Sequence, residues 1–451
     1  MNPEFQRNLW LEASPRRLAW AAVTLVLVYG AALLTVRGRP ELAAHTLSGV
    51  GFLVYVVCGL LWASRAAGGS VLAEIAERTW DFQRLSALTP WQMTWGKLFG
   101  AGSLAWLCAL SGLLAMVPLT LQAGAPRGWW SLGFFLALAL LFQALALGAA
   151  LIGVRKARAE GRPARGGVVL GGLLLGLVLL SAVSGSSGFQ KGVGLDWLRW
   201  LFEGDGFVAW WGLIAPAAGF RTLAAGFFAL FAVVGAWRLM RLELMMGSAL
   251  LVWPVFLAFL AVFAGGFPFR NEGLGASLVA AALAVALCAY AAAFAEPADR
   301  VRLRRFAAAL RGGDVRGASP LAPAALAPWV VAVALVILAL GVGGWRDVRA
   351  WQGAALMAFV ARDLGVIAWF RMGPRPQRGD LAAILALALA YGVGGVVGST
   401  LAGRQGAAVF APLAGYPISL ISGVVQALVM GLLVARRFSA PPVAPASAPG
   451  S

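Results

Sequence analysis

The chain has 451 residues, of which 61% are hydrophobic and only 12% are charged, whereas soluble domains average roughly 45–50% apolar and 25% charged residues. This composition excludes an ordinary soluble protein and predicts an all-α polytopic membrane protein. The formal net charge of +18 does not indicate a nucleic-acid partner, because the basic residues fall between apolar runs, where they orient membrane helices.

The chain offers little metal or histidine chemistry. Its three cysteines, Cys58, Cys108 and Cys288, fall inside apolar runs at spacings that match neither a disulfide framework nor a metal knuckle. The single histidine, His45, excludes a site built from several histidines. We therefore expect no metal site and no cofactor of the chain's own.

The first element that we expect is a helix lying in the membrane interface. Residues 2–17 mix Phe5, Leu9 and Trp10 with glutamates and arginines, a composition that suits the bilayer surface better than its interior.

Twelve apolar segments follow, each near the roughly 20 residues that a membrane-spanning helix needs. We place these spans near 18–36, 46–66, 98–122, 129–154, 167–187, 207–237, 249–268, 274–295, 326–344, 351–369, 381–401 and 407–434. Most of the 36 Lys and Arg fall in alternate connecting segments, which places both termini in the cytoplasm. The chain is then expected to lie in a lipid bilayer, and we expect this bilayer to be a bacterial cytoplasmic (inner) membrane.

One long segment between the second and third spans, Glu74 to Lys97, is neither apolar enough to span nor polar enough to be a loose loop. Glu74, Glu77, Arg78 and Asp81 recur at i, i+3, i+4 and i+7, which predicts an amphipathic helix with one charged face. Thr89, Pro90 and Gln92 then form a capping-box pattern, and this pattern predicts a second helix that runs through Gly96 and Lys97 into the next span.

The later part of the chain repeats the topology. Before the sixth span, residues 184–220 are rich in Trp and Gly, which predicts short re-entrant helices on the outer side. Residues 1–243 and 244–438 then form two six-helix halves in the same orientation, as after a duplication or the addition of an accessory module. Residues 439–451 consist mainly of Pro, Ala and Ser and are expected to be disordered.

Few residues are candidates for a nucleotide-binding, ion-binding or catalytic site. No phosphate-binding loop is present, so any ATP must be hydrolysed by another chain. Arg362 and Asp363 fall inside the tenth span and mark an intramembrane polar site, where neighbouring charges are expected to point to different helix faces. An outer acidic cluster of Asp196, Glu203 and Asp205 lies among tryptophans and is explained by a solvated loop without catalysis.

The stretch from Glu74 to Lys97 resembles a segment of the membrane subunits of type-2 ABC exporters, over about residues 1–243 of this chain. That family shows E-R-x-x-G-T-L-E-x-L-x-x-T-P followed by G-K. The matching positions here are Glu77, Thr79, Asp81, Leu85, Thr89, Pro90, Gly96 and Lys97. Where the family often has Gly before Thr, this chain has Arg78.

The resemblance implies a permease subunit whose cytoplasmic coupling helix docks on a separate ATPase subunit. It assigns docking to Glu74, Glu77, Arg78, Asp81 and Arg84, and positioning of the coupling segment to Thr89, Pro90, Gly96 and Lys97. If residues 244–438 are a degenerate permease copy, one chain could supply both halves of the channel. If they are an accessory domain, we expect assembly as a homodimer or with a second permease chain. The alternative from another class is an ion-coupled twelve-span secondary transporter, which rests on the six-plus-six topology and on Asp363.

Overall fold

A computed structural model describes residues 2–86, 88–122, 125–160, 206–246, 251–297, 299–318, 321–344, 347–373, 378–412 and 415–439. These residues are mostly helical, and among them ten helices are long and apolar enough to cross a membrane. The protein is therefore a polytopic helical membrane protein. The predicted span 167–187 lies outside the described residues, and the predicted span 249–268 corresponds to a shorter apolar helix of 14 residues.

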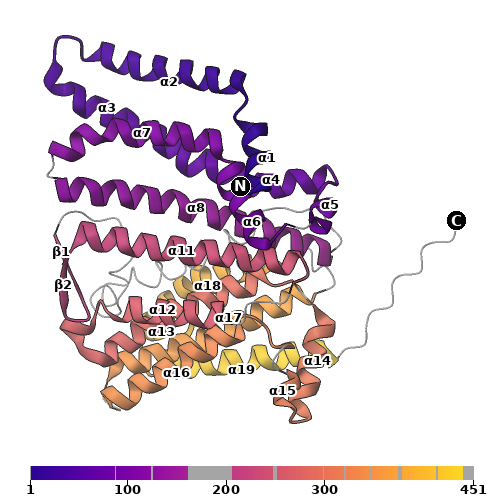
Figure 1. The fold of residues 1–451 in the computed structure, drawn as a ribbon. Coiled ribbons are helices and arrows are strands. Elements are labelled where there is room, and N and C mark those ends of the chain that lie inside the picture. The colour runs from indigo at the N-terminus through magenta and orange to yellow at the C-terminus, as the bar shows by residue number, and fades with distance from the viewer. Residues whose placement is uncertain are drawn as a thin grey trace. The chain divides into compact units, whose positions relative to one another are not determined.

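Contacts divide the chain into two compact units, which are described separately. The first unit contains, in chain order, α1 (Pro3–Glu12), α2 (Pro15–Thr35), α3 (Pro40–Tyr55), the π-helix η1 (Val56–Trp62), α4 (Ala63–Ala76), α5 (Trp80–Leu85), α6 (Pro90–Trp95), the π-helix η2 (Gly96–Gly100), α7 (Ser103–Gln122), α8 (Ala125–Glu160), β1 (Phe207–Trp210), β2 (Leu213–Pro216) and α11 (Ala217–Glu243). In this unit α8 packs between α4 and α11, and α3 packs against α7 (Figure 1).

The predicted N-terminal helix is confirmed as a helix over Pro3–Glu12. The Asn2 side chain caps it by accepting hydrogen bonds from the backbone N–H groups of Glu4 and Phe5. Ser14 in turn caps α2, whose first residue is Pro15. These two caps explain why the chain forms two helices here and not one.

A β-hairpin replaces the re-entrant helices that were predicted before the sixth span, at least over residues 207–216. Strands β1 and β2 pair antiparallel, with Trp210 opposite Leu213. The two turn residues, Trp211 and Gly212, have φ values of 47° and 80°, which is typical of a two-residue hairpin turn. The helical prediction was wrong here, and the spanning helix α11 begins only at Ala217.

The second unit contains most of the remaining helices, and α12 (Val252–Gly265) leads into it. They are α13 (Phe269–Ala295), α14 (Arg300–Arg311), α15 (Val315–Ala318), α16 (Leu326–Gly343), α17 (Val348–Arg371), α18 (Gly379–Phe410) and α19 (Ile418–Ser439). Helix α17 packs against α13, α16, α18 and α19, so it lies at the centre of this unit.

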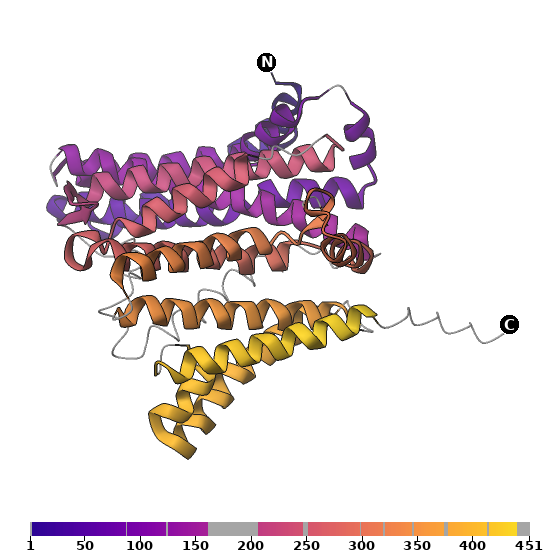
Figure 2. The ribbon, with the colours of Figure 1, turned by 90° about the horizontal axis from the view of Figure 1, so that it is seen from below.

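Helix α18 is broken near its end. Ala402 and Gly403 leave the helical region, with φ 57° at Gly403, and the chain folds back so closely that a Cβ on Gly398 would lie 2.4 Å from the carbonyl oxygen of Gly406. The turn can be followed in Figure 2. The predicted start of the twelfth span at residue 407 is therefore wrong, because 404–410 is the returning arm and α19 begins at Ile418.

The division into domains at residue 243 stays a prediction. The predicted tail, residues 439–451, lies outside the described residues apart from Ser439, which ends α19.

Candidate functional site

The segment between α4 and α5 turns at Arg78. Helix α4 ends at Ala76, and Arg78 adopts φ 57°, in the left-handed region. The N–H of Thr79 donates to the carbonyl of Glu74 at 2.9 Å, and the N–H of Arg78 donates to the carbonyl of Ile75 at 3.1 Å. This pair of bonds is the Schellman motif, in which glycine usually occupies the position that Arg78 holds here.

The turn corrects the prediction of one amphipathic helix with a continuous charged face. Because the helix axis changes at Arg78, Glu74 points into the protein and is only 5% exposed, whereas Glu77, Arg78 and Asp81 are exposed. Arg84 is half-buried and pairs with Asp81 at 3.4 Å. Glu74 therefore does not share a surface with the other residues to which docking was assigned.

The predicted start of the second helix is confirmed. The Thr89 hydroxyl accepts from the Gln92 backbone N–H at 3.2 Å, and the Gln92 side chain accepts from the Thr89 N–H at 2.9 Å, which completes the capping box. Pro90 occupies the first turn of α6. The helical chain then continues through η2, which carries Gly96 and Lys97, and a short turn into α7.

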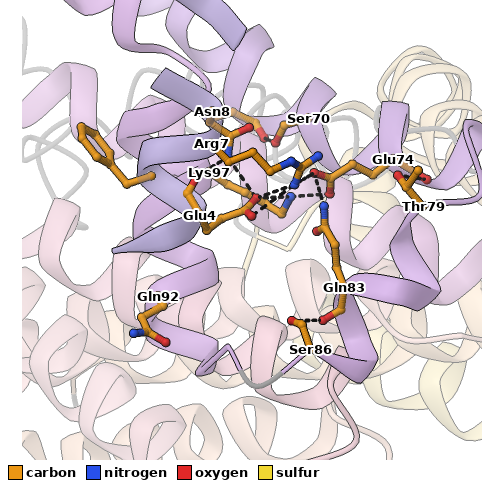
Figure 3. Close-up of polar contacts among 12 residues, drawn as sticks. Glu4, Arg7, Asn8, Ser70, Glu74, Thr79, Gln83, Ser86, Gln92 and Lys97 are labelled. Atoms are coloured by element: carbon orange, nitrogen blue, oxygen red, sulfur yellow. Dashed lines mark hydrogen bonds and ion pairs between the residues drawn. The ribbon is translucent and has the colours of Figure 1, made fainter. Parts of the chain in front are cut away.

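A buried ion cluster lies under this segment. The Lys97 ammonium is fully buried and pairs with Glu74 of α4 and, at 3.4 Å, with Glu4 of α1. Arg7 of α1 pairs with Glu4 at 3.2 Å and with Glu74 at 3.3 Å. Figure 3 shows Lys97 between the two carboxylates. We call Glu4, Arg7, Glu74 and Lys97 the Lys97 cluster.

Hydrogen bonds from neutral side chains complete the Lys97 cluster. The Gln83 amide of α5 donates to Glu74 at 2.7 Å, and the Asn8 amide donates to Glu4 at 2.9 Å. Two carboxylates thus face two cations, so the cluster is neutral overall and its charges have the partners that burial demands. Through Gln83, the cluster also ties α5 to α4.

Glycines let α1 approach the cluster. A Cβ on Gly96 would lie 2.5 Å from Glu4 Cγ and 2.9 Å from the Glu4 carbonyl carbon, and a Cβ on Gly100 would lie 2.8 Å from Asn8 Cβ. Only glycine at these two positions permits the observed contact between α1 and η2. The positioning role expected of Gly96 thus has a physical counterpart, although its function stays a prediction.

An exposed surface lies on the outer side of the same segment. It consists of Glu77, Arg78, Asp81 and Phe82, the last of which is 78% exposed. We call these four residues the coupling surface. Large exposed aromatic side chains among charges are typical of protein-binding sites.

The role of α1 in this site was missed by the sequence prediction. Glu4, Arg7 and Asn8 lie at i, i+3 and i+4, so they share one helix face. The corresponding pattern in η2 is the pair of glycines at positions 96 and 100, which are four residues apart and so lie on one face. Neither pattern predicts that this face of α1 packs against the glycines of η2, since 93 residues separate Glu4 from Lys97.

The second unit contains the predicted intramembrane polar site. Asp363 and Arg362 are buried, and the Arg362 Nε donates to Asp363 Oδ1 at 2.8 Å. The hydroxyls of Tyr290 and Tyr391 both donate to Asp363 Oδ2, at 2.6 and 2.8 Å. The expectation that the two charges point to different faces was wrong, because the long Arg362 side chain bends back to its neighbour.

The polar site also reaches the broken end of α18. Arg362 Nη1 donates to the Gln426 amide oxygen at 2.8 Å, and Gln426 in turn donates to the carbonyl of Val409 at 2.7 Å. Val409 belongs to the returning arm of α18, and Gln426 to α19. One hydrogen-bonded chain therefore joins α13, α17, α18 and α19.

Among the described residues, no group of His, Cys, Asp and Glu side chains could hold a metal ion. Comparison of the chain with protein-family models, with curated proteins and with solved structures found no match.

Proposed function

We propose that this chain is the membrane-spanning permease subunit of an ATP-driven ABC exporter, energised by a separate ATPase subunit that docks on the coupling surface. The main observation in support of the proposal is the way in which α5 is attached to the rest of the first unit. Its outer side is an exposed, aromatic and charged surface, and its inner side is fixed through Gln83 to the buried Lys97 cluster. The family resemblance of residues 77–97 supports the same assignment.

The Lys97 cluster makes this attachment of α5 rigid. Separating Lys97 from either carboxylate would leave an unpaired charge in a low-dielectric interior, which costs several kcal/mol. A force on α5 therefore moves α4, η2 and α1 together, and α4 and η2 continue into membrane-spanning helices. Such a connected element can transmit a conformational change while doing no chemistry itself.

The proposal includes the twelve-span arrangement with both termini in the cytoplasm of a bacterial cell. In this arrangement, the exporter assembles as a homodimer or with a second permease chain. The coupling surface then faces the ATP-containing side of the inner membrane, as the distribution of Lys and Arg predicts.

Reversal of charge at Glu77 and Asp81 tests the docking assignment. Both side chains are exposed, so E77K/D81K should leave folding intact while an ATPase that co-purifies with the wild-type chain is lost. E41K is the matched control, because Glu41 is also exposed, in the first turn of α3 and away from the coupling surface. Normal co-purification and normal substrate-stimulated ATP hydrolysis by E77K/D81K would refute the docking role.

A second candidate is an ion-coupled secondary transporter. The observation in its favour is the buried Asp363 beside a broken helix, since discontinuous helices and intramembrane carboxylates often form coupling-ion sites. Against it, Asp363 is already paired with Arg362 and two tyrosine hydroxyls. Transport that survives loss of ATP and stops when the ion gradient collapses would favour this candidate.

A further inference from the structure

Among the described helices of the second unit, α14 is the most amphipathic and the most basic. Leu303, Phe306, Ala307 and Leu310 recur at i, i+3, i+4 and i+7 and form one apolar stripe. None of these four side chains is buried, and Leu310 is 50% exposed. Leu303, Phe306 and Ala307 are half-buried, so the apolar face of α14 is only partly covered within the described part of the chain.

Arginines surround this stripe. Residues 299–316 contain six arginines and two aspartates, and one of the aspartates, Asp299, caps the helix N-terminus. Arg305, Arg311 and Arg316 are exposed and form no ion pair among the described residues. The surface around the stripe is therefore strongly positive.

Short connections hold α14 close to the ends of two helices that are long and apolar enough to span a membrane, α13 and α16. Only four residues separate the end of α13 from the start of α14, and α13 is long and apolar enough to span the bilayer. Glu296 pairs with Arg302 and accepts from the Ala324 N–H at 2.7 Å, and Arg302 donates to the carbonyl of Ala322 at 2.6 Å. These bonds fix the first turn of α14 between the end of α13 and the start of α16.

We propose that α14 is a membrane-surface helix whose arginines bind anionic phospholipid headgroups while its apolar stripe enters the acyl boundary. Charge complementarity favours anionic lipid as the binding partner, because a strongly basic helix with a narrow apolar stripe is typical of helices that bind an anionic membrane surface. Its position supports the same choice, since a helix fixed at the end of two spans lies at headgroup depth. This inference is independent of the ATPase-docking proposal.

Hydrogen exchange of the full-length protein tests the proposal in nanodiscs of phosphatidylcholine with and without phosphatidylglycerol. We expect the backbone amides of 300–311 to exchange more slowly when phosphatidylglycerol is present at low salt, and this protection to fall as salt rises. In R305Q/R311Q the lipid-dependent protection should fall on the order of tenfold. R37Q/R39Q, which removes two exposed arginines between α2 and α3, should keep it.

Two results would overturn the proposal. One is equal exchange of 300–311 in both lipids at low salt in the wild-type protein. The other is protection that is indifferent to phosphatidylglycerol and arises only when a purified ATPase partner is added, because α14 would then be a protein-docking helix. The salt titration of the wild-type protein separates these outcomes even if the variant fails to fold.

Discussion

At the scale of single residues, Lys97 is the residue on which the candidate site depends most. Its ammonium is fully buried, it pairs with both Glu4 and Glu74, and it lies 5.3 Å from the centre of the Trp80 ring. Removing one partner from a buried ion cluster costs more than the cluster contributes in total, because the remaining charges are left without compensation.

K97M should therefore lower the free energy of unfolding by about 3–5 kcal/mol. Thermal unfolding of the purified protein in detergent measures the loss. The matched control is E4Q/E74Q/K97M, which removes the three buried charges of the cluster together, leaves only the partly exposed Arg7 charged and should recover part of the stability. If K97M unfolds at the temperature of the wild-type protein, the cluster does not hold α1, α4 and η2 together.

Arg78 illustrates a different residue-scale effect, which is backbone conformation. Its φ of 57° costs an L-residue about 1–2 kcal/mol relative to the right-handed region, and glycine offsets this strain at the expense of a more flexible unfolded chain. R78G should therefore be neutral or stabilising by up to about 1 kcal/mol, whereas the β-branched R78V should destabilise by about 1–3 kcal/mol. Chemical denaturation compares the two, and equal stability of R78V and R78G would contradict the strained turn.

The sequence shows which residues are unusual at this scale but not which of them meet. The turn at Arg78 was missed, because the charge spacing from Glu74 to Asp81 predicted one continuous helix, whereas the capping box of Thr89 and Gln92 was local enough to predict in full. The pairing of Lys97 with Glu4 depends on how α1 docks, and no local pattern encodes that docking.

At the scale of elements, the contact between α1 and η2 controls the site. The contact depends on the absence of side chains at Gly96 and Gly100, since any Cβ there would overlap α1. The π-helical geometry of η2 presents Lys97 toward Glu4 and Glu74, and such widened turns often occur at functional sites.

G96A should displace α1 and destabilise the protein by about 1–3 kcal/mol. Limited proteolysis of the N-terminal residues, together with thermal unfolding, reports the displacement. G69A is the control, because Gly69 lies in α4 with open space at its Cβ position, and alanine there should be neutral or stabilising by up to about 1 kcal/mol. An unchanged cleavage pattern in G96A would show that α1 does not depend on this contact.

Elements also show where sequence patterns stop being informative. Long apolar runs predicted most spanning helices, because length and hydropathy alone determine them. The β-hairpin at 207–216 and the returning arm of α18 were missed, because the chain turns there at residues with positive φ inside otherwise apolar stretches. These residues are Trp211 and Gly212 in the hairpin and Gly403 in α18.

At the scale of the whole molecule, the two units offer different chemistry. The first contains the coupling surface above the Lys97 cluster, and the second contains the Asp363 site and the basic helix α14. Hydropathy could predict a polytopic helical membrane protein, but the roles of the two units depend on contacts between distant residues, such as Tyr290 with Asp363.

The most direct test of the central claim is site-specific photo-crosslinking at Phe82, the highly exposed aromatic residue of the coupling surface. A photo-reactive phenylalanine analogue at this position should, in intact cells, form an adduct with a polypeptide that contains the phosphate-binding motif GxxxxGK followed by Ser or Thr. The same analogue at Leu401, which is 82% exposed in the second unit, is the control and should not. Adducts at Phe82 with lipid alone, or with no nucleotide-binding polypeptide, would contradict the account.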